Sequence, residues 1–118
     1  MTSRFVILEH TYQGVHYDLM LELGDVLRTW RLETPPEPGR TVGAEPLPDH
    51  RLLYLDYEGP ISGDRCSVRR WDAGTYTGDA SGSNHVCVEL HGERLCGRLE
   101  LRLVEQQHWE CVYRLEGA

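Results

Sequence analysis

The feature of this sequence that most constrains its fold is an alternation of apolar and polar residues with a period of two. Residues 4–9, 15–23 and 26–32 show it most clearly. Successive side chains of a β-strand point to opposite faces, so this period is typical of strands that are buried on one side. No stretch of the chain has the 3.6-residue period of an amphipathic helix. The alternation therefore predicts an all-β fold with little helix.

About eight short strands are expected, and turn residues separate them. Beyond the three runs above, strands are expected over residues 51–58, 66–71, 74–76, 85–90, 94–104 and 108–115, with a turn at 72–74. Gly24 and Asp25 predict a hairpin over residues 15–32. Residues 34–49 contain five prolines, which predicts a connecting loop. Such strands close into a compact antiparallel barrel or a sandwich, and we expect one domain over residues 1–118.

Composition limits the classes of function. The chain is 40% hydrophobic, carries a net charge of −7, and draws all 12 of its basic residues from arginine. An acidic chain of this kind is not expected to coat nucleic acid, although a few local arginines suffice to bind one phosphate. No apolar run approaches the ~18 residues that cross a bilayer, and no signal peptide is recognisable. We therefore expect a cytoplasmic protein without a membrane partner.

His16 and Asp18 are the residues whose spacing indicates chemistry. They lie two positions apart on an expected strand, so both side chains point from the same face. His10 ends the preceding strand and is one short turn away. Two imidazoles and one carboxylate suit manganese, iron or zinc, although an exposed, hydrogen-bonded pair has the same spacing. His50 lies between the proline-rich segment and the next strand, where functional residues often gather.

Six runs of the sequence resemble, in order, the 3′-phosphoesterase domain family of bacterial DNA ligase D. They are RFVILEH, VHYDLMLEL, VLRTW, DHRLLYLDYEG, WDAGTY and VELHGERLCGRLEL, and the resemblance extends from Arg4 to about Tyr113. The matching family patterns are FVIQxH, HYDxRLE, LxSW, EDHPLxYxDFEG, WDxGTW and LxLHGxKLxGxWxL. The ordered combination is far more specific than any single run. We therefore expect a short, stand-alone and divergent member of this family.

The resemblance implies a β-barrel enzyme of DNA repair that removes phosphates and ribonucleotides from the 3′ ends of DNA strands. It also implies a divalent metal, manganese first, with zinc or another transition metal as alternatives. His10, His16 and Asp18 match the metal ligands, and His50 matches the histidine that contacts the scissile phosphate. Tyr54 is the second expected phosphate contact, and His16 and His50 are the expected catalytic residues. The expected partner is a nucleic-acid 3′ end, and no repair protein is identified.

The sequence departs from the family pattern near the expected phosphate site. The arginine of HYDxRLE is Met20 here, and a thioether cannot donate a hydrogen bond to phosphate. The glycine-rich segment GxYGAG is replaced by SGDRCSVRR. Arg51, Arg65, Arg69 and Arg70 are the candidates for the missing cation.

Two other functions remain open. A binding or assembly module that kept the barrel and lost turnover is favoured by Met20 and by the acidic charge. Met20→Arg discriminates between the two functions, since a gain of activity would show that the scaffold is otherwise competent. His16 and Asp18 also fit the facial triad of Fe(II) oxygenases, with His91 as the third ligand and Arg102 for the co-substrate. A chain of 118 residues is short for that fold.

Overall fold

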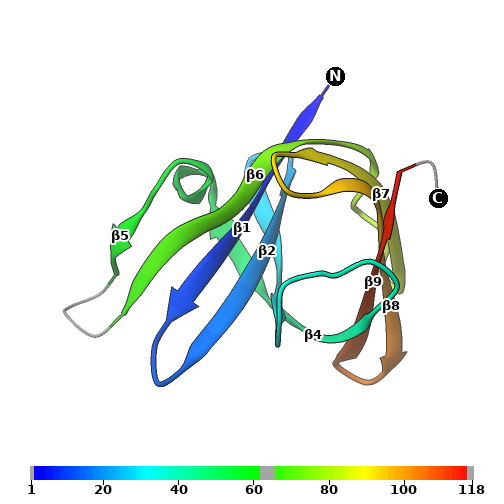
Figure 1. Ribbon diagram of the computed structural model, residues 1–118, viewed down its shortest axis with the longest axis horizontal. Helices are drawn as coiled ribbons and strands as arrows, with labels where there is room; N and C mark the ends of the chain where they lie inside the picture. The colour runs from blue at the N-terminus through cyan, green and yellow to red at the C-terminus, as the bar shows by residue number, and fades with distance from the viewer. Residues whose placement is uncertain (1, 62–65, 117–118) are drawn as a thin grey trace.

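The computed structural model describes residues 2–61 and 66–116, and these form an antiparallel β-barrel (Figure 1). Eight strands close it in the order β1-β2-β3-β4-β9-β8-β7-β6, with β6 pairing back onto β1, while β5 is a short strand beside β6. The elements are β1 (Ser3–Thr11), β2 (Val15–Leu23), β3 (Val26–Leu32), β4 (Thr41–Arg51), the 3-10 helix η1 (Leu52–Leu55), β5 (Gly59–Pro60), β6 (Ser67–Asp79), β7 (His85–Gly92), β8 (Cys96–Glu105) and β9 (His108–Leu115). The expected all-β barrel of about eight strands is confirmed.

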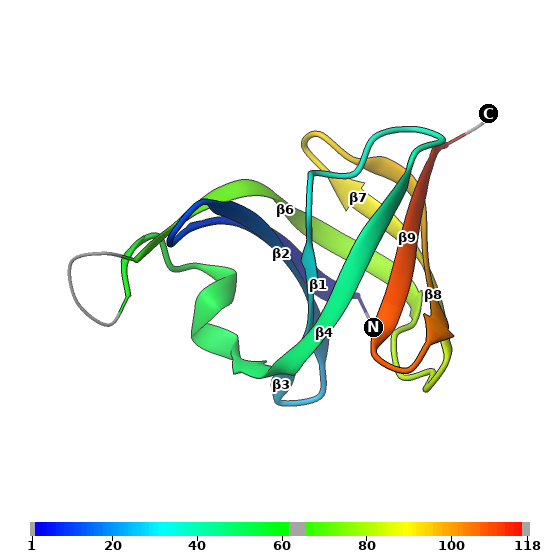
Figure 2. The ribbon, with the colours of Figure 1, turned by 90° about the horizontal axis from the view of Figure 1, so that it is seen from below.

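Strands β1, β2 and β3 bury both of their faces. One face joins the main core, in which the rings of Trp30 and Trp109 meet edge to face with centroids 5.4 Å apart. The opposite face forms a second apolar cluster, and η1 covers it. The buried members of this second cluster are Val6, Leu8, Met20, Leu27, Leu55 and Val68. Figure 2 shows η1 beside β1 and β2, away from β7, β8 and β9. The face of the sheet that carries Met20 is therefore largely apolar and buried, at least where η1 covers it.

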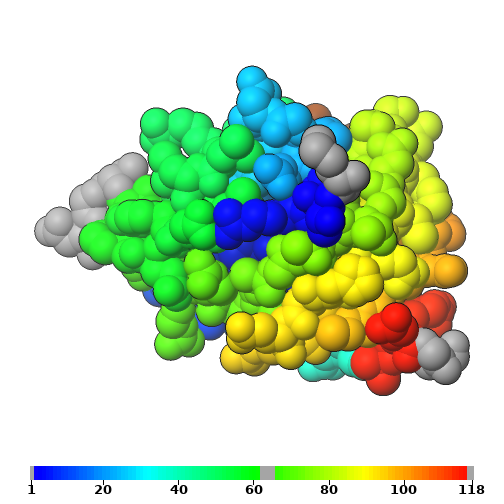
Figure 3. All heavy atoms as spheres, turned by 90° about the horizontal axis from the view of Figure 1, so that it is seen from above, coloured from blue at the N-terminus to red at the C-terminus, as the bar shows by residue number. Residues whose placement is uncertain are grey.

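Helix η1 replaces part of the strand that the sequence predicts over residues 51–58, so that prediction is wrong. A short run of apolar residues does not distinguish a strand from a helical turn. The turn buries Leu55 and leaves Leu53 exposed. Just after η1, Asp56 forms an ion pair of 2.6 Å with Arg4 of β1, and Figure 3 shows the green segment lying against the blue start of the chain there. No helix within the described ranges is long and apolar enough to cross a membrane.

Strand β4 occupies most of the segment expected to be a proline-rich loop, which corrects the prediction for residues 34–49. It lies between β3 and β9 in the barrel. Its pairing with β9 ends at Ala44, whereas its pairing with β3 continues to Arg51. Pro46 and Pro48 therefore lie where β4 has a partner on one side only, and a missing N–H is tolerated in such a position.

Strand β6 continues through residues 72–74, so the turn expected there is not formed. Instead, the pairing of β6 with β1 shifts register at this point and skips Trp71. Ile7 of β1 pairs with Asp72, and the next residue of β1 pairs with Arg70. The irregularity turns the Asp72 carboxylate toward the loop between β7 and β8. It accepts hydrogen bonds of 2.9–3.1 Å from the backbone N–H groups of Ala73, Glu93, Arg94 and Leu95. A buried carboxylate with four such donors is fully satisfied without a counter-ion.

Candidate functional site

The pairing of β1, β2 and β3 brings three of the predicted site residues together. His10 is the cross-strand partner of His16 in the β1–β2 ladder. Asp18, two residues further along β2, is the direct partner of Arg31 on β3. These four side chains share the face of the sheet that also carries the second apolar cluster.

Arg31 is the counter-ion of Asp18. Its Nε donates to Asp18 Oδ1 at 3.1 Å, and its Nη2 lies 3.5 Å from Oδ2. The same Nη2 lies 3.1 Å from Nδ1 of His10. The Asp18 side chain is only 4% exposed, whereas that of Arg31 is 29% exposed. A nearly buried carboxylate is thus neutralised by a guanidinium that still reaches solvent.

The hydrogen bonds of His10 fix its tautomer. A guanidinium can only donate, so Nδ1 of His10 accepts from Arg31. Nε2 then carries the hydrogen and donates to Sγ of Cys66, 2.7 Å away. Burial, opposed by Asp18 and reinforced by Arg31, lowers the pKa of His10, in keeping with a neutral ring.

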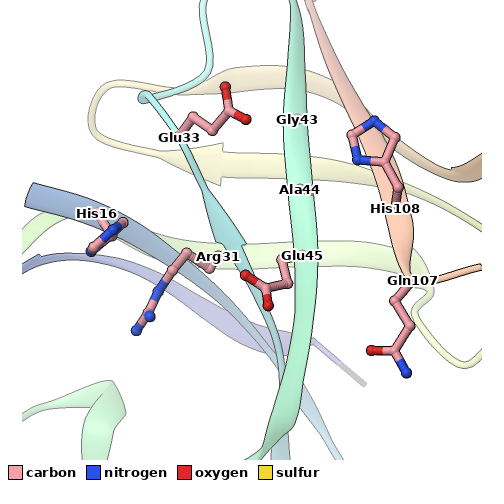
Figure 4. Close-up of a pocket in the computed structure, with 8 residues that line it drawn as sticks. All are labelled: His16, Arg31, Glu33, Gly43, Ala44, Glu45, Gln107 and His108. Atoms are coloured by element: carbon pink, nitrogen blue, oxygen red, sulfur yellow. The ribbon is translucent and has the colours of Figure 1, made fainter.

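His16 has an unsatisfied nitrogen. Its Nδ1 is buried and has no hydrogen-bond partner among the residues that the structure describes. His16 and Arg31 line one end of a hollow of about 510 Å³, which passes β4 and ends at Gln107 and His108 (Figure 4). A buried polar atom without a partner costs about 1–3 kcal/mol, so this nitrogen is suited to a ligand.

His50 and Tyr54 form a separate group. Nδ1 of His50 donates to the carbonyl of Pro48 at 2.9 Å, and the two aromatic rings meet edge to face at 5.7 Å. Both line a second hollow, of about 470 Å³, together with Arg51. Within the described residues no hydrogen bond or ion pair joins this group to Asp18. Tyr54 packs against the second apolar cluster, which also contains Met20.

The three predicted metal ligands fit a divalent ion by their chemistry. Two imidazoles and a carboxylate are a common donor set for manganese, iron or zinc, and the unpartnered Nδ1 of His16 is consistent with a missing ligand. In residues 2–61 and 66–116, however, no three His, Cys, Asp or Glu side chains converge as they do around a metal ion. Arg31 lies against Asp18 and His10, so an ion can bind these groups only after the guanidinium moves.

Most of the arginines suggested by the sequence have other roles. Arg69 pairs with Glu9 at 3.1 Å, and Arg70 donates to the carbonyl of Leu55. Arg51 lines the hollow beside His50. Arg65 lies outside the described residues.

Sequence reasoning missed Arg31, although the signal was present. The two-residue turn at Gly24 and Asp25 pairs Leu23 with Val26. Counting back along both strands from that pair places Asp18 opposite Arg31. The predicted hairpin therefore contained the cation that contacts the site.

The residues suggested for an oxygenase triad do not gather. His91 lies at the end of β7, which β1 and β6 separate from β2. Arg102 of β8 pairs with Glu100 at 3.5 Å. Neither residue forms a hydrogen bond or ion pair with His16 or Asp18 in the described part of the chain.

Comparison with known proteins identifies the family. The family model described as the DNA Ligase D 3′-phosphoesterase domain matches residues 8–102. The multifunctional non-homologous end joining DNA repair protein LigD of Mycobacterium tuberculosis is 33% identical over 124 residues, which covers 98% of this chain and 16% of the relative. The multifunctional non-homologous end joining protein LigD of Pseudomonas aeruginosa is 32% identical over 131 residues, 97% of this chain and 15% of the relative. The chain therefore spans less than a fifth of the length of these relatives, and it belongs to the DNA ligase D 3′-phosphoesterase domain family.

Proposed function

We propose that this chain acts on DNA 3′ ends in strand-break repair, as a metal-dependent phosphoesterase that removes a 3′-phosphate or a 3′-ribonucleotide. The proposal depends on one observation above the others. His10, His16 and Asp18 share one face of the β1–β2–β3 sheet, and His16 presents a buried, unpartnered nitrogen there. The family membership and the DNA end-joining role in the relatives' names support the same activity.

His10, His16 and Asp18 are the proposed ligands of the divalent ion, with manganese preferred and zinc or another transition metal as alternatives. Such an ion supplies Lewis-acid stabilisation of phosphoryl oxygens and lowers the pKa of a bound water. Asp18 becomes available once its carboxylate is released by Arg31. The neutral ring of His10 keeps a lone pair on Nδ1 for the same purpose.

His50 and Tyr54 are the proposed phosphate contacts. The hydrogen bond from Nδ1 of His50 to Pro48 orients the ring and leaves Nε2 toward the substrate. A protonated Nε2 would bind a phosphoryl oxygen or donate a proton to the leaving oxygen, as a general acid does. The Tyr54 hydroxyl adds a neutral hydrogen-bond donor beside it.

The test is a primer-processing assay. A 5′-labelled primer annealed to a template, ending in either a 3′-phosphate or a single 3′-ribonucleotide, is incubated with the protein and Mn²⁺. We expect processing by the wild type, loss with His16→Ala, and near wild-type rates with His108→Ala, which removes a histidine from the far end of the same hollow. If the wild type binds Mn²⁺ and leaves both primers unprocessed, the proposed activity is wrong.

A binding module without turnover is the second candidate. Met20 in the position of the family's arginine and the Arg31 guanidinium against two of the three ligands favour it. In that case the protein retains 3′-phosphorylated DNA in a binding assay and releases no phosphate at any Mn²⁺ concentration.

A further inference from the structure

Position 20 carries no cation, and its surroundings are largely apolar. Met20 is 2% exposed and lies in the apolar cluster beneath η1. Its partner on β3 is Thr29, which is also buried and whose hydroxyl donates to the carbonyl of Leu27. The buried carboxylate of Asp18 lies two residues away on the same face of β2, but Arg31 already binds it. The phosphate-binding cation of this chain therefore has to come from another strand.

Arg31 provides such a cation on β3. Of its five N–H groups, those on Nε and Nη2 contact Asp18 and His10. Nη1 has no partner within residues 2–61 and 66–116. The side chain is 29% exposed and lines the hollow next to His16. As far as the described residues show, Arg31 thus has donors left for a ligand where it lines the hollow beside His16.

Two carboxylates in the same hollow limit where an anion can bind. Glu45 of β4 is the ladder partner of Arg31, and the side chain of Glu33, the residue after the end of β3, lies beside Gly43 of β4. Figure 4 shows the Arg31 guanidinium pointing away from Glu45. A phosphate would be repelled by the two glutamates, so it would bind at the end formed by Arg31 and His16.

We propose that Arg31 is the phosphate-binding arginine of this chain and that it exchanges partners. Without a metal ion it binds Asp18; when a divalent ion takes the carboxylate, the guanidinium turns to the 3′-terminal phosphate. The ion and the guanidinium compete because both carry positive charge and both need the same carboxylate oxygens. A phosphate dianion then offers the planar guanidinium the paired acceptors that suit it. This inference rests on the proposed function and identifies the residue that binds its substrate.

If Arg31 exchanges partners in this way, Arg31→Gln should change the affinity for Mn²⁺ and the affinity for a 3′-phosphate in opposite directions. Removing the guanidinium removes a competitor for Asp18, so the affinity for Mn²⁺ should rise, by about threefold or more. Removing it also removes a charged donor to phosphate, so the affinity for a 3′-phosphate should fall by about tenfold or more. A guanidinium that serves only as a structural counter-ion would instead make both affinities fall.

The experiment measures binding rather than turnover. Isothermal titration gives the Kd for Mn²⁺. Fluorescence anisotropy, at saturating Mn²⁺, gives the Kd for an oligonucleotide that ends in a 3′-methylenephosphonate, whose P–C bond cannot be hydrolysed. The same oligonucleotide with a 3′-hydroxyl reports binding outside the phosphate site. Arg102→Gln, which removes an exposed arginine of β8, is the matched control.

We expect Arg31→Gln to bind Mn²⁺ more tightly and the phosphonate more weakly, with the 3′-hydroxyl oligonucleotide and Arg102→Gln unchanged. Arg31→Lys keeps a cation beside Asp18 and replaces Arg31→Gln in the experiment if Arg31→Gln fails to fold. Its affinity for the phosphonate should fall several-fold, because an ammonium lacks the planar arrangement of donors of a guanidinium. Unchanged phosphonate binding in these variants, weaker binding of both ligands to Arg31→Gln, or a wild type that does not prefer the phosphonate over the hydroxyl would overturn the inference. A wild type that binds the phosphonate through Arg31 and releases no phosphate from DNA would contradict the proposed enzyme and leave this inference standing.

Discussion

Two aspartates of the barrel are equally buried, each 3% exposed, and differ in what satisfies them. Among the residues that the structure describes, Asp72 accepts only from backbone N–H groups, most of them in the turn between β7 and β8. Asp18 is bound by the side chain of Arg31, and the His10 ring lies 3.4 Å from the same carboxylate. Backbone donors are fixed by the fold, whereas side chains can rotate away. A buried carboxylate therefore indicates an exchangeable site only when its donors are side chains.

The same contrast separates the sequence motifs that identify the family. WDAGTY and LHGERL, distant in sequence, meet where Asp72 binds the turn after Gly92. HYD contributes His16 and Asp18 to the candidate site. The first two motifs stabilise the fold, and the third supplies the proposed ligands.

The largest effect on stability is expected for Asp72→Ala. Four backbone donors would lose a charged acceptor inside the barrel, where each unmet group costs about 1–3 kcal/mol. We expect a loss of about 4 kcal/mol in the free energy of unfolding, measured by urea denaturation with the ion-free protein. Asp72→Asn, which keeps the volume, should lose somewhat less, because its amide can still accept. A loss below about 1 kcal/mol for Asp72→Ala would contradict the structural role.

Met20→Arg should also destabilise the protein, so we do not expect this change to increase activity. The guanidinium would enter the apolar cluster beneath η1, where the nearby carboxylate of Asp18 is already bound by Arg31, at a cost of about 3 kcal/mol. Met20→Leu, close in volume, should cost less than about 1.5 kcal/mol. Thermal and urea denaturation measure both, and a stable Met20→Arg protein with increased turnover would show that position 20 is open to substrate after all.

Gly92→Ala tests the Asp72 region from its other side. A Cβ atom at this position would lie 2.4 Å from Oδ2 of Asp72 and 2.8 Å from the Phe5 ring. We expect a loss of about 2 kcal/mol from overpacking. Gly24→Ala, whose Cβ would meet nothing within 4 Å, adds a methyl group without crowding, and any loss there comes from the positive φ of Gly24, 64°. A loss below about 0.5 kcal/mol in Gly92→Ala would show that crowding against Asp72 is unimportant.

Asp18→Asn should have the smallest effect on stability. Arg31 reaches solvent and can rehydrate once its counter-ion is neutral, so a loss of about 1 kcal/mol is expected without metal. The wild type should gain stability on addition of Mn²⁺, whereas this variant should gain little, because ligand binding stabilises only the form that binds. Melting curves with Mn²⁺ and with a chelator measure the difference, and an equal gain in both proteins would exclude Asp18 as a ligand.

The barrel and its first hairpins were predictable because a period of two and a two-residue turn are local signals. Strand β4 was not, because a count of prolines does not say which side of a strand lacks a partner. The role of Asp72 was also hidden, since its acceptor positions serve backbone groups 21–23 residues away. The position of Arg31 opposite Asp18 was predictable, since the turn at Gly24 and Asp25 sets the register of the two strands.

The most direct test of the distinction between the two aspartates is the rate of Mn²⁺-dependent 3′-phosphate release by the wild type, Asp18→Asn and Asp72→Asn. The assay is run at a low temperature at which circular dichroism shows all three folded. Loss of a metal ligand removes several kcal/mol of charge stabilisation, so the rate of Asp18→Asn should fall at least about a hundredfold. Folded Asp72→Asn should stay within a few-fold of the wild type. An active Asp18→Asn protein, or equal losses in the two variants, would contradict the assignment of Asp18 to function and Asp72 to structure.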